Sequence, residues 1–260
     1  MSEGGEKRLE LMCRPLHSIS KSSSWSPIVV IVALALLCSC TGGNSKRIKD
    51  VISHMPSRDA QAPYDGIDIS SYQGYIDWNK VSSDKNIRFV YIKATEGATY
   101  RSAHYVHNLA QARRNGLLVG SYHYLSPSST IDEQFQNFST VALKDVQDLV
   151  PMLDVEVRGE WSRSQLLDSV DKFCKLVERH FGVQPMIYST MEFYNKNLTP
   201  HFNQHLLYIG RYSKEEPEIN WEGQYTIWQF SETGIIPGIN AYVDLCHFHK
   251  DAWVQDIVLK

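Results

Sequence analysis

Cysteine is scarce in this sequence, and most of it lies near the N-terminus. Of the 5 cysteines in 260 residues, Cys13, Cys38 and Cys40 precede residue 41, so only Cys174 and Cys246 remain in the body. Two cysteines do not make the disulfide framework on which small secreted domains depend. They could pair with each other, although two buried free thiols are the more ordinary state. The sequence leaves both states open.

Concentrated charge and grouped metal ligands are also lacking. The 26 Lys and Arg residues nearly balance the 29 Asp and Glu residues, which gives a net charge of −3 at pH 7. No segment of the body gathers its basic residues into a stripe, so nucleic acid is not expected as a partner. No spacing of the His-Glu-x-x-His type occurs, so the chemistry is expected to need no metal ion and no other cofactor.

The hydrophobic run near the N-terminus is too short to cross a membrane. It covers Ile28–Leu37, about 10 residues, whereas a bilayer core requires roughly 20. Basic residues precede this run at Lys7, Arg8, Arg14 and Lys21. A basic region followed by a short apolar core and small residues is typical of a secretory signal peptide.

The end of this run resembles the lipobox of bacterial lipoproteins, in which the signal is cut before a cysteine that then carries lipid. It reads Leu37-Cys38-Ser39-Cys40, which would make Cys40 the lipidated first residue of the mature chain. Residues 1–39 are therefore expected to be a signal peptide. The polar segment 40–63 shows no sustained periodicity and is expected to be a tether. We expect a monomeric protein of the cell envelope, held at the periplasmic face or outer membrane through Cys40.

From residue 64 to residue 260 the pattern changes to alternating strands and helices. Helical spacing predicts helices over Ser102–Asn115, Ile131–Leu143, Ser164–Phe181 and Met191–Asn197. The predicted strands are Gly66–Ser70, Arg88–Ala94, Leu117–Tyr124, Val150–Val155, Pro185–Tyr188, Leu206–Ile209, Tyr225–Phe230 and Tyr242–Leu245. Eight strands with helices between most of them predict an α/β fold, an irregular (β/α)8-type barrel with fewer helices than strands.

Two carboxylates end the fourth predicted strand, which lies within Leu149–Glu156. Asp154 and Glu156 are separated by one apolar residue, so on a strand they point to the same face, with Cβ atoms roughly 6–7 Å apart. Like charges this close resist joint ionisation, and partial burial adds to the effect. One raised acid beside an ionised neighbour is the arrangement that glycosidic cleavage needs. A solvated strand end would carry the same two residues.

Polar and aromatic side chains recur at the other strand ends, where the chemistry of such barrels lies. Each has a structural explanation of its own; His123, for example, is more often a satisfied core histidine than a catalyst. Together, carboxylates and aromatic faces form the kind of cleft that binds sugars. The residues are Asp68, Lys93, Glu96, Tyr122, His123, Tyr124, Tyr188, Arg211, Trp228, Gln229 and Asp244.

These blocks resemble the glycoside hydrolase family 25 lysozymes, in the family's order and over residues 64–250. The opening motif is Gly-Ile-Asp-Ile-Ser-Ser-Tyr-Gln-Gly at 66–74, and Phe-Val-Tyr-Ile-Lys-Ala-Thr-Glu-Gly follows at 89–97. Gly-Ser-Tyr-His-Tyr at 120–124, Leu-Asp-Val-Glu at 153–156 and Ile-Tyr-Ser at 187–189 come next. Ile-Trp-Gln-Phe-Ser at 227–231 and Val-Asp-Leu at 243–245 complete the set.

The resemblance implies a peptidoglycan muramidase on an irregular barrel, with glycan strands as the partner. By it, Glu156 is the general acid, and Asp154 orients the 2-acetamido group of N-acetylmuramic acid for attack on the anomeric carbon. Asp68 and Asp244 are auxiliary acids of the cleft. Inversion by direct water attack has also been argued for the family. The strand-end residues above, together with Tyr72, are the expected substrate-binding set.

The sequence also departs from the family and leaves alternatives open. Ser71-Tyr72 stands where a histidine and a tryptophan are common, and Gly210-Arg211 replaces a more usual pairing, which puts subsite preference in doubt. A chitinase-like barrel is one alternative, but those enzymes usually carry another aspartate where Met152 stands. The other alternative is a non-catalytic, wall-binding lipoprotein.

Overall fold

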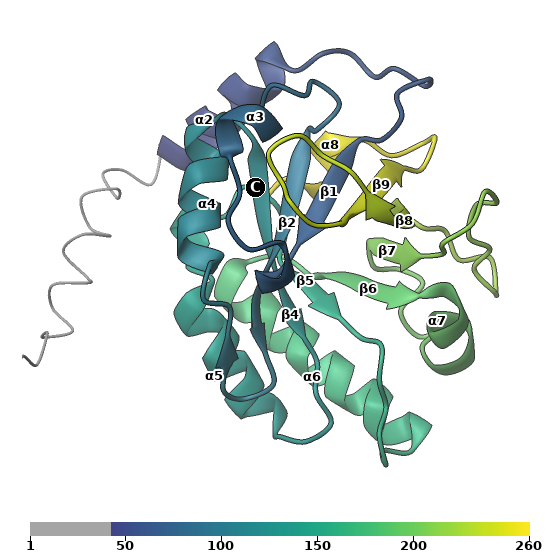
Figure 1. Cartoon of the computed structure of the whole chain (residues 1–260). Helices are drawn as coiled ribbons and strands as arrows, with labels where there is room; N and C mark the ends of the chain where they lie inside the picture. The colour runs from purple at the N-terminus through teal and green to yellow at the C-terminus, as the bar shows by residue number, and fades with distance from the viewer. Residues whose placement is uncertain (1–42) are drawn as a thin grey trace, which may run out of the picture. The chain divides into compact units, whose positions relative to one another are not determined.

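The computed structural model describes residues 43–260 (Figure 1). The predicted signal peptide and the predicted lipidation site at Cys40 lie outside these residues. Among residues 43–260, no helix has both the length and the apolar character needed to cross a bilayer.

A closed barrel of strands forms the centre of the described chain. Its strands are β1 Gly66–Ile69, β2 Phe89–Glu96, β4 Leu118–Tyr124, β5 Met152–Asp154, β6 Met186–Thr190, β7 Leu207–Gly210, β8 Ile227–Gly234 and β9 Val243–Phe248. They follow one another around the ring as β1-β9-β8-β7-β6-β5-β4-β2, and a β1–β2 pairing closes it. The short strand β3, Tyr100–Arg101, pairs with the end of β2 outside the ring. The predicted eight-stranded barrel is confirmed.

The last strand of the ring runs against its neighbours. β9 is antiparallel to both β1 and β8, whereas the other pairs around the ring are parallel. The start of β9 therefore lies at the same end of the barrel as the carboxyl ends of the other strands. Asp244, near that start, sits directly opposite Asp68 of β1 in the register. The eight predicted strands alone did not reveal this reversal.

Helices cover the outside of the ring unevenly. They are α3 Trp78–Val81, α4 Tyr105–Arg114, α5 Ile131–Val141, α6 Arg163–Phe181 and α7 Met191–Asn197, with α8 Val254–Ile257 near the C-terminus. Capping boxes start α5 at Thr130 and α6 at Ser162, and Gly182, in the left-handed conformation with φ 81°, ends α6. No helix separates β7 from β8 or β8 from β9. The barrel is irregular at this side, as predicted.

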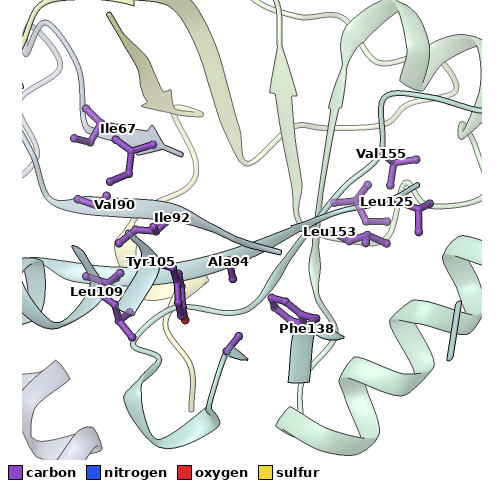
Figure 2. Packing of buried hydrophobic residues seen from close by; sticks show 14 of the residues in the cluster. Ile67, Val90, Ile92, Ala94, Tyr105, Leu109, Leu125, Phe138, Leu153 and Val155 are labelled. Atoms are coloured by element: carbon purple, nitrogen blue, oxygen red, sulfur yellow. The ribbon is translucent and has the colours of Figure 1, made fainter. Parts of the chain in front are cut away.

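Two cores follow from the alternation of side chains along the strands. Outward residues such as Val90, Ile92 and Leu153 pack against the helices (Figure 2). Inward residues, among them Phe89, Tyr91 and Tyr208, fill the barrel. Gly120 makes room for this filling, since a Cβ there would lie 2.3 Å from the ring of Tyr91. The two remaining cysteines, at positions 174 and 246, are buried free thiols.

The segment expected to be a tether contains a docked helix, α2 Gly43–His54. Ile48 of α2 is 5% exposed and joins the inner core. The guanidinium of Arg47 forms an ion pair with Asp148 at 2.7 Å and donates to the carbonyl of Leu117 at 2.7 Å. Leu117 and Asp148 lie just before β4 and β5, so α2 closes the amino-terminal end of the barrel. The prediction of an irregular tether is wrong for these residues, because one apolar face in a polar segment suffices for docking.

Candidate active site

Four carboxylates gather at the mouth of the barrel, the end where the parallel strands finish. Asp68 comes from β1, Asp244 from β9 and Asp154 from the last position of β5. Glu156 follows two residues later. Met152 packs inside the barrel while Leu153 and Val155 pack outside it, so Asp154 and Glu156 both face inward. The expectation that these two acids share a face therefore agrees with the packing around them.

Of the four acids, Asp68 accepts hydrogen bonds from two neutral side chains. Its Oδ2 accepts hydrogen bonds from the Tyr208 hydroxyl at 2.6 Å and from Gln229 Nε2 at 2.9 Å. Burial raises the pKa of Asp68, and the hydrogen bonds from Tyr208, Gln229 and Asp244 lower it in part. Burial and the neighbouring Asp68 raise the pKa of Asp244 to about 9. The side-chain hydrogen bond between the two acids lowers the pKa of Asp68 and raises that of Asp244, so its direction is from Asp244 to Asp68.

Asp154 is buried with one oxygen unsatisfied. Its side chain is 7% exposed, and Oδ1 has no hydrogen-bond partner. Burial, followed by the charge of Glu156, raises the pKa of Asp154 well above its ordinary value. Glu156 is only partly buried, and burial is also the main reason that its pKa is raised. A buried acceptor without a donor is costly in a folded protein, so Asp154 is placed to receive a donor from outside the chain.

One cation lies close to this pair. Lys93 of β2 lowers the pKa of both Asp154 and Glu156 through its charge. Its Nζ contacts Glu96 Oε2 at 2.7 Å and lies 4.6 Å from the centre of the Tyr124 ring. Lys93, Glu96 and Tyr124 thus lie together beside the acid pair.

Tyrosines and one glutamine complete the floor. The pKa of Tyr122 is raised by burial and then by the charges of all four acids, so its hydroxyl lies among them. Gln229 accepts hydrogen bonds from Tyr188 at 2.7 Å and from Tyr212 at 2.9 Å while it donates to Asp68. Gln229 therefore orders three side chains of the mouth from a buried position.

Three predicted binding residues have their hydrogen-bond and ion-pair partners away from the four acids. His123 is fully buried, with Nδ1 against Thr95 at 2.8 Å and Nε2 against Gln134 at 3.1 Å, and burial lowers its pKa to about 4. Trp228 packs against the outer core and donates its indole N–H to the carbonyl of Arg211. The guanidinium of Arg211 is paired with Glu215 at 2.6 Å. His123 and Trp228 face outward because their neighbours along the strand face inward. Arg211 is instead held by its local ion pair with Glu215.

Tyr72 lies at the rim rather than in the floor. Its side chain is 71% exposed in the short helical turn Ser71–Gln73. The hydroxyl of Tyr100, which the sequence did not single out, lies 2.8 Å from Ser71 Oγ and joins this turn to β3. Tyr208 was also missed, although its place in a strand, between the outward Leu207 and Ile209, is the signal that could have revealed it.

The described chain offers no metal centre of the usual kind. Across residues 43–260, no group of three or more His, Cys, Asp or Glu side chains is arranged to hold a metal ion. What the mouth can do is hold a proton on one of several coupled acids and present a buried acceptor to a bound amide or hydroxyl.

Known proteins share both this sequence pattern and this fold. The pattern of the Glycosyl hydrolases family 25 matches residues 67–239. The chain is 36% identical over 206 residues to the uncharacterized protein YegX of Escherichia coli O157:H7, covering 78% of this chain and 74% of that one. It is 33% identical over 194 residues to the autolytic lysozyme of Clostridium acetobutylicum, covering 75% of this chain and 58% of that one.

A solved structure extends the likeness to three dimensions. The family 25 glycosyl hydrolase of Bacillus anthracis matches with a TM-score of 0.68 and 27% identity, over 76% of this chain and 94% of that one. The family match covers more than half of the chain and includes Asp68, Asp154 and Glu156. The chain belongs to glycosyl hydrolase family 25 and is a glycoside hydrolase of the lysozyme type.

Proposed function

We propose that the protein is a peptidoglycan muramidase that hydrolyses the β-1,4 bond between N-acetylmuramic acid and N-acetylglucosamine. The observation that carries this proposal is the buried, unsatisfied Oδ1 of Asp154 next to the partly buried Glu156. The 2-acetamido group of the sugar brings an N–H donor to within reach of a carboxylate at that place. A hydroxyl could also donate to Oδ1, but only the acetamido group also carries a carbonyl oxygen that can attack the anomeric carbon.

Asp154 acts on the acetamido group of the substrate. Once the substrate N–H donates to Oδ1, the ionised form of Asp154 is favoured, because a hydrogen bond to a carboxylate lowers its pKa. The acetamido carbonyl oxygen then attacks the anomeric carbon, and the bond from that carbon to the leaving oxygen breaks. Substrate assistance of this type needs a carboxylate that holds the amide, so the second acid need not be the nucleophile.

Glu156 supplies the proton to the leaving oxygen. Its pKa is raised mainly by burial, so it retains its proton to higher pH than an ordinary glutamate. In the complex, ionisation of Asp154 leaves the shared proton on Glu156, since two adjacent carboxylates resist joint ionisation. Water later adds to the anomeric carbon and returns a proton to Glu156.

Asp68 and Asp244 support the pair from the opposite side of the mouth. The proton held by Asp244 and the donors Tyr208 and Gln229 fix the carboxylate of Asp68. The Asp68 carboxylate adds negative potential beside the anomeric carbon, where positive charge develops in the transition state. We assign them as auxiliary acids that bind substrate and tune the pair.

The protein acts, in this proposal, in the cell envelope. Lipidation at Cys40 would attach it to a membrane, and glycan strands of the wall are its partners. Metabolic labelling with a fatty-acid analogue tests the anchor, and Cys40→Ala should abolish the label and release the protein from membranes. Label retained in that variant would contradict the anchor without touching the chemistry.

Mass spectrometry of the fragments released from purified sacculi tests the activity. Cleavage by a muramidase leaves N-acetylmuramic acid at the new reducing end. Reducing N-acetylglucosamine would show that the other bond is cut, and hydrolysis of chitin oligomers in preference to sacculi would favour a chitinase-like enzyme. Binding to sacculi without release of reducing ends would make the protein a wall-binding lipoprotein.

A further inference from the structure

A hollow lies at the same end of the barrel as the acids but outside the ring of strands. It has a volume of about 760 Å³, and we call it the lateral groove. Pro127 and Ser129 of the loop after β4 line it, with Glu133 of α5, Trp161 of the loop after β5, and Asp168 of α6. A volume between about 300 and 1,000 Å³ is typical of sites for small molecules and short peptides.

The loop that carries Glu156 leads directly into this groove. Trp161 follows Glu156 by five residues, so their Cα atoms lie at most about 18 Å apart. Gly159 between them has φ 53°, and a Cβ there would approach the Pro127 ring to 2.8 Å. This close packing fixes the path of the loop between Glu156 and Trp161. It therefore also fixes the distance from the acid pair to the groove.

The lining has the chemistry of a peptide site that prefers an amine. Ser128 and Ser169 contribute hydroxyl groups to the lining, and Trp161 contributes an indole. Glu133 and Asp168 supply carboxylates, while neither Lys nor Arg lines the groove. The hydrogen bonds from Thr130 lower the pKa of Glu133, which keeps its charge. Hydroxyls suit peptide groups, an indole suits an aliphatic side chain, and the carboxylates suit an ammonium group.

We propose that the lateral groove binds the stem peptide of the wall strand. This inference rests on the proposed function, because the lactyl group of each N-acetylmuramic acid carries such a peptide. Four extended residues span about 13–14 Å, which is within the upper limit of about 18 Å on the distance between the Cα atoms of Glu156 and Trp161. The diamino acid of the stem brings the free amine that Glu133 and Asp168 would receive. The enzyme therefore reads the peptide as well as the glycan, and prefers strands that still carry their stems.

Two substrates from one source test this. Purified sacculi are compared with the same glycan strands after an N-acetylmuramoyl-L-alanine amidase has removed the stems, and kcat/KM is measured from released reducing ends. Wild-type protein should favour the peptide-bearing strands by about tenfold, the size of one good charged contact. Trp161→Ala and Asp168→Asn should each lose most of that preference while their rates on stripped strands stay within twofold.

A neighbouring substitution provides the control. Glu160→Gln removes one negative charge from the loop that carries Trp161, at a residue that does not line the groove, and should keep the wild-type preference. Asp168→Asn keeps the inference testable should Trp161→Ala fail to fold. Equal losses on both substrates, or no preference in the wild type, would overturn the inference. No reducing ends from either substrate would instead defeat the muramidase proposal on which it depends.

Discussion

The two ends of the barrel treat buried carboxylates in opposite ways. At the amino-terminal end, Asp148 is fully buried and is paired with Arg47 at 2.7 Å and Arg113 at 3.1 Å. At the mouth, Asp154 is almost as buried but has an unsatisfied oxygen and a second carboxylate beside it. The same type of side chain therefore serves stability at one end and is left available at the other.

The difference separates buried carboxylates that stabilise the fold from one that destabilises it. A buried acid with its full set of donors holds neighbouring segments together, and Asp65 repeats this with Arg88 at 3.3 Å and with the backbone N–H of Phe248 at 3.0 Å. An acid without them is destabilising until a ligand supplies the missing donor. Substitutions at the two ends should thus have opposite signatures, and four predictions test this.

The largest effect is expected at the mouth. Glu156→Gln removes the general acid while keeping its shape, so hydrolysis of sacculi should fall by about 10²–10⁴-fold. The melting temperature should stay the same or rise, because a source of charge repulsion is lost. Turnover near that of the wild type would remove Glu156 from its role. Glu160→Gln, on the same loop, is the matched control and should leave turnover unchanged.

The next effect is expected at the amino-terminal end. Asp148→Ala leaves two guanidinium groups without their carboxylate, so the free energy of unfolding should fall by about 3 kcal/mol, as for other broken buried pairs. Urea denaturation measures this, and kcat of the protein that remains folded should be unchanged. Asp50→Asn on the exposed face of α2 should change stability by less than about 0.5 kcal/mol. A stable but inactive Asp148→Ala protein would contradict the division between the two ends.

The dependence of stability on pH sharpens the comparison. The pKa of Asp244 rises from 3.8 to about 9 on folding, so the folded state binds a proton that the unfolded chain has lost. The stability that this bound proton contributes is fully present below about pH 4 and is lost as the pH rises toward 9. The free energy of unfolding should decrease over this range, and Asp244→Asn should flatten the decrease. An unchanged slope in the variant would show that Asp244 does not hold this proton.

The smallest effect concerns the position of a pH profile. Lys93 lowers the pKa of Asp154 and Glu156, so Lys93→Met should move the alkaline limb of kcat/KM to higher pH. Glu96→Gln removes a charge that raises the pKa of Asp154 and should move the limb to lower pH. A shift in the same direction for both variants would mean that substrate contacts, and not charge, set the profile.

Much of the mouth could be predicted because strands obey a strict alternation. Asp154 and Glu156 were assigned to one face by their spacing alone, and the buried Leu153 and Val155 confirm the packing behind that assignment. The same rule, applied to each strand separately, would have turned His123 and Trp228 outward. Proximity to a strand end was a weaker guide than the direction of the side chain.

Other features depended on partners far along the chain. The docking of α2 relies on the ion pair of Arg47 with Asp148, about one hundred residues later. The polar sequence around Arg47 does not predict this partner. The reversal of β9 depends on the absence of a helix between β8 and β9, which the sequence shows, and on register, which it does not. Alternation along the strand can place Tyr208 inside the barrel. Its hydrogen bond to Asp68 is seen only when β7 faces β1 across the barrel.

The docked α2 helix also determines how the molecule bears a load. Gly43 leaves the fold beside the starts of β4 and β5, so any attachment upstream pulls on the closed end of the barrel. Tension along the chain would be resisted first by the ion pair of Arg47 with Asp148 and by the buried Ile48. The mouth, at the other end of the barrel, would stay undistorted.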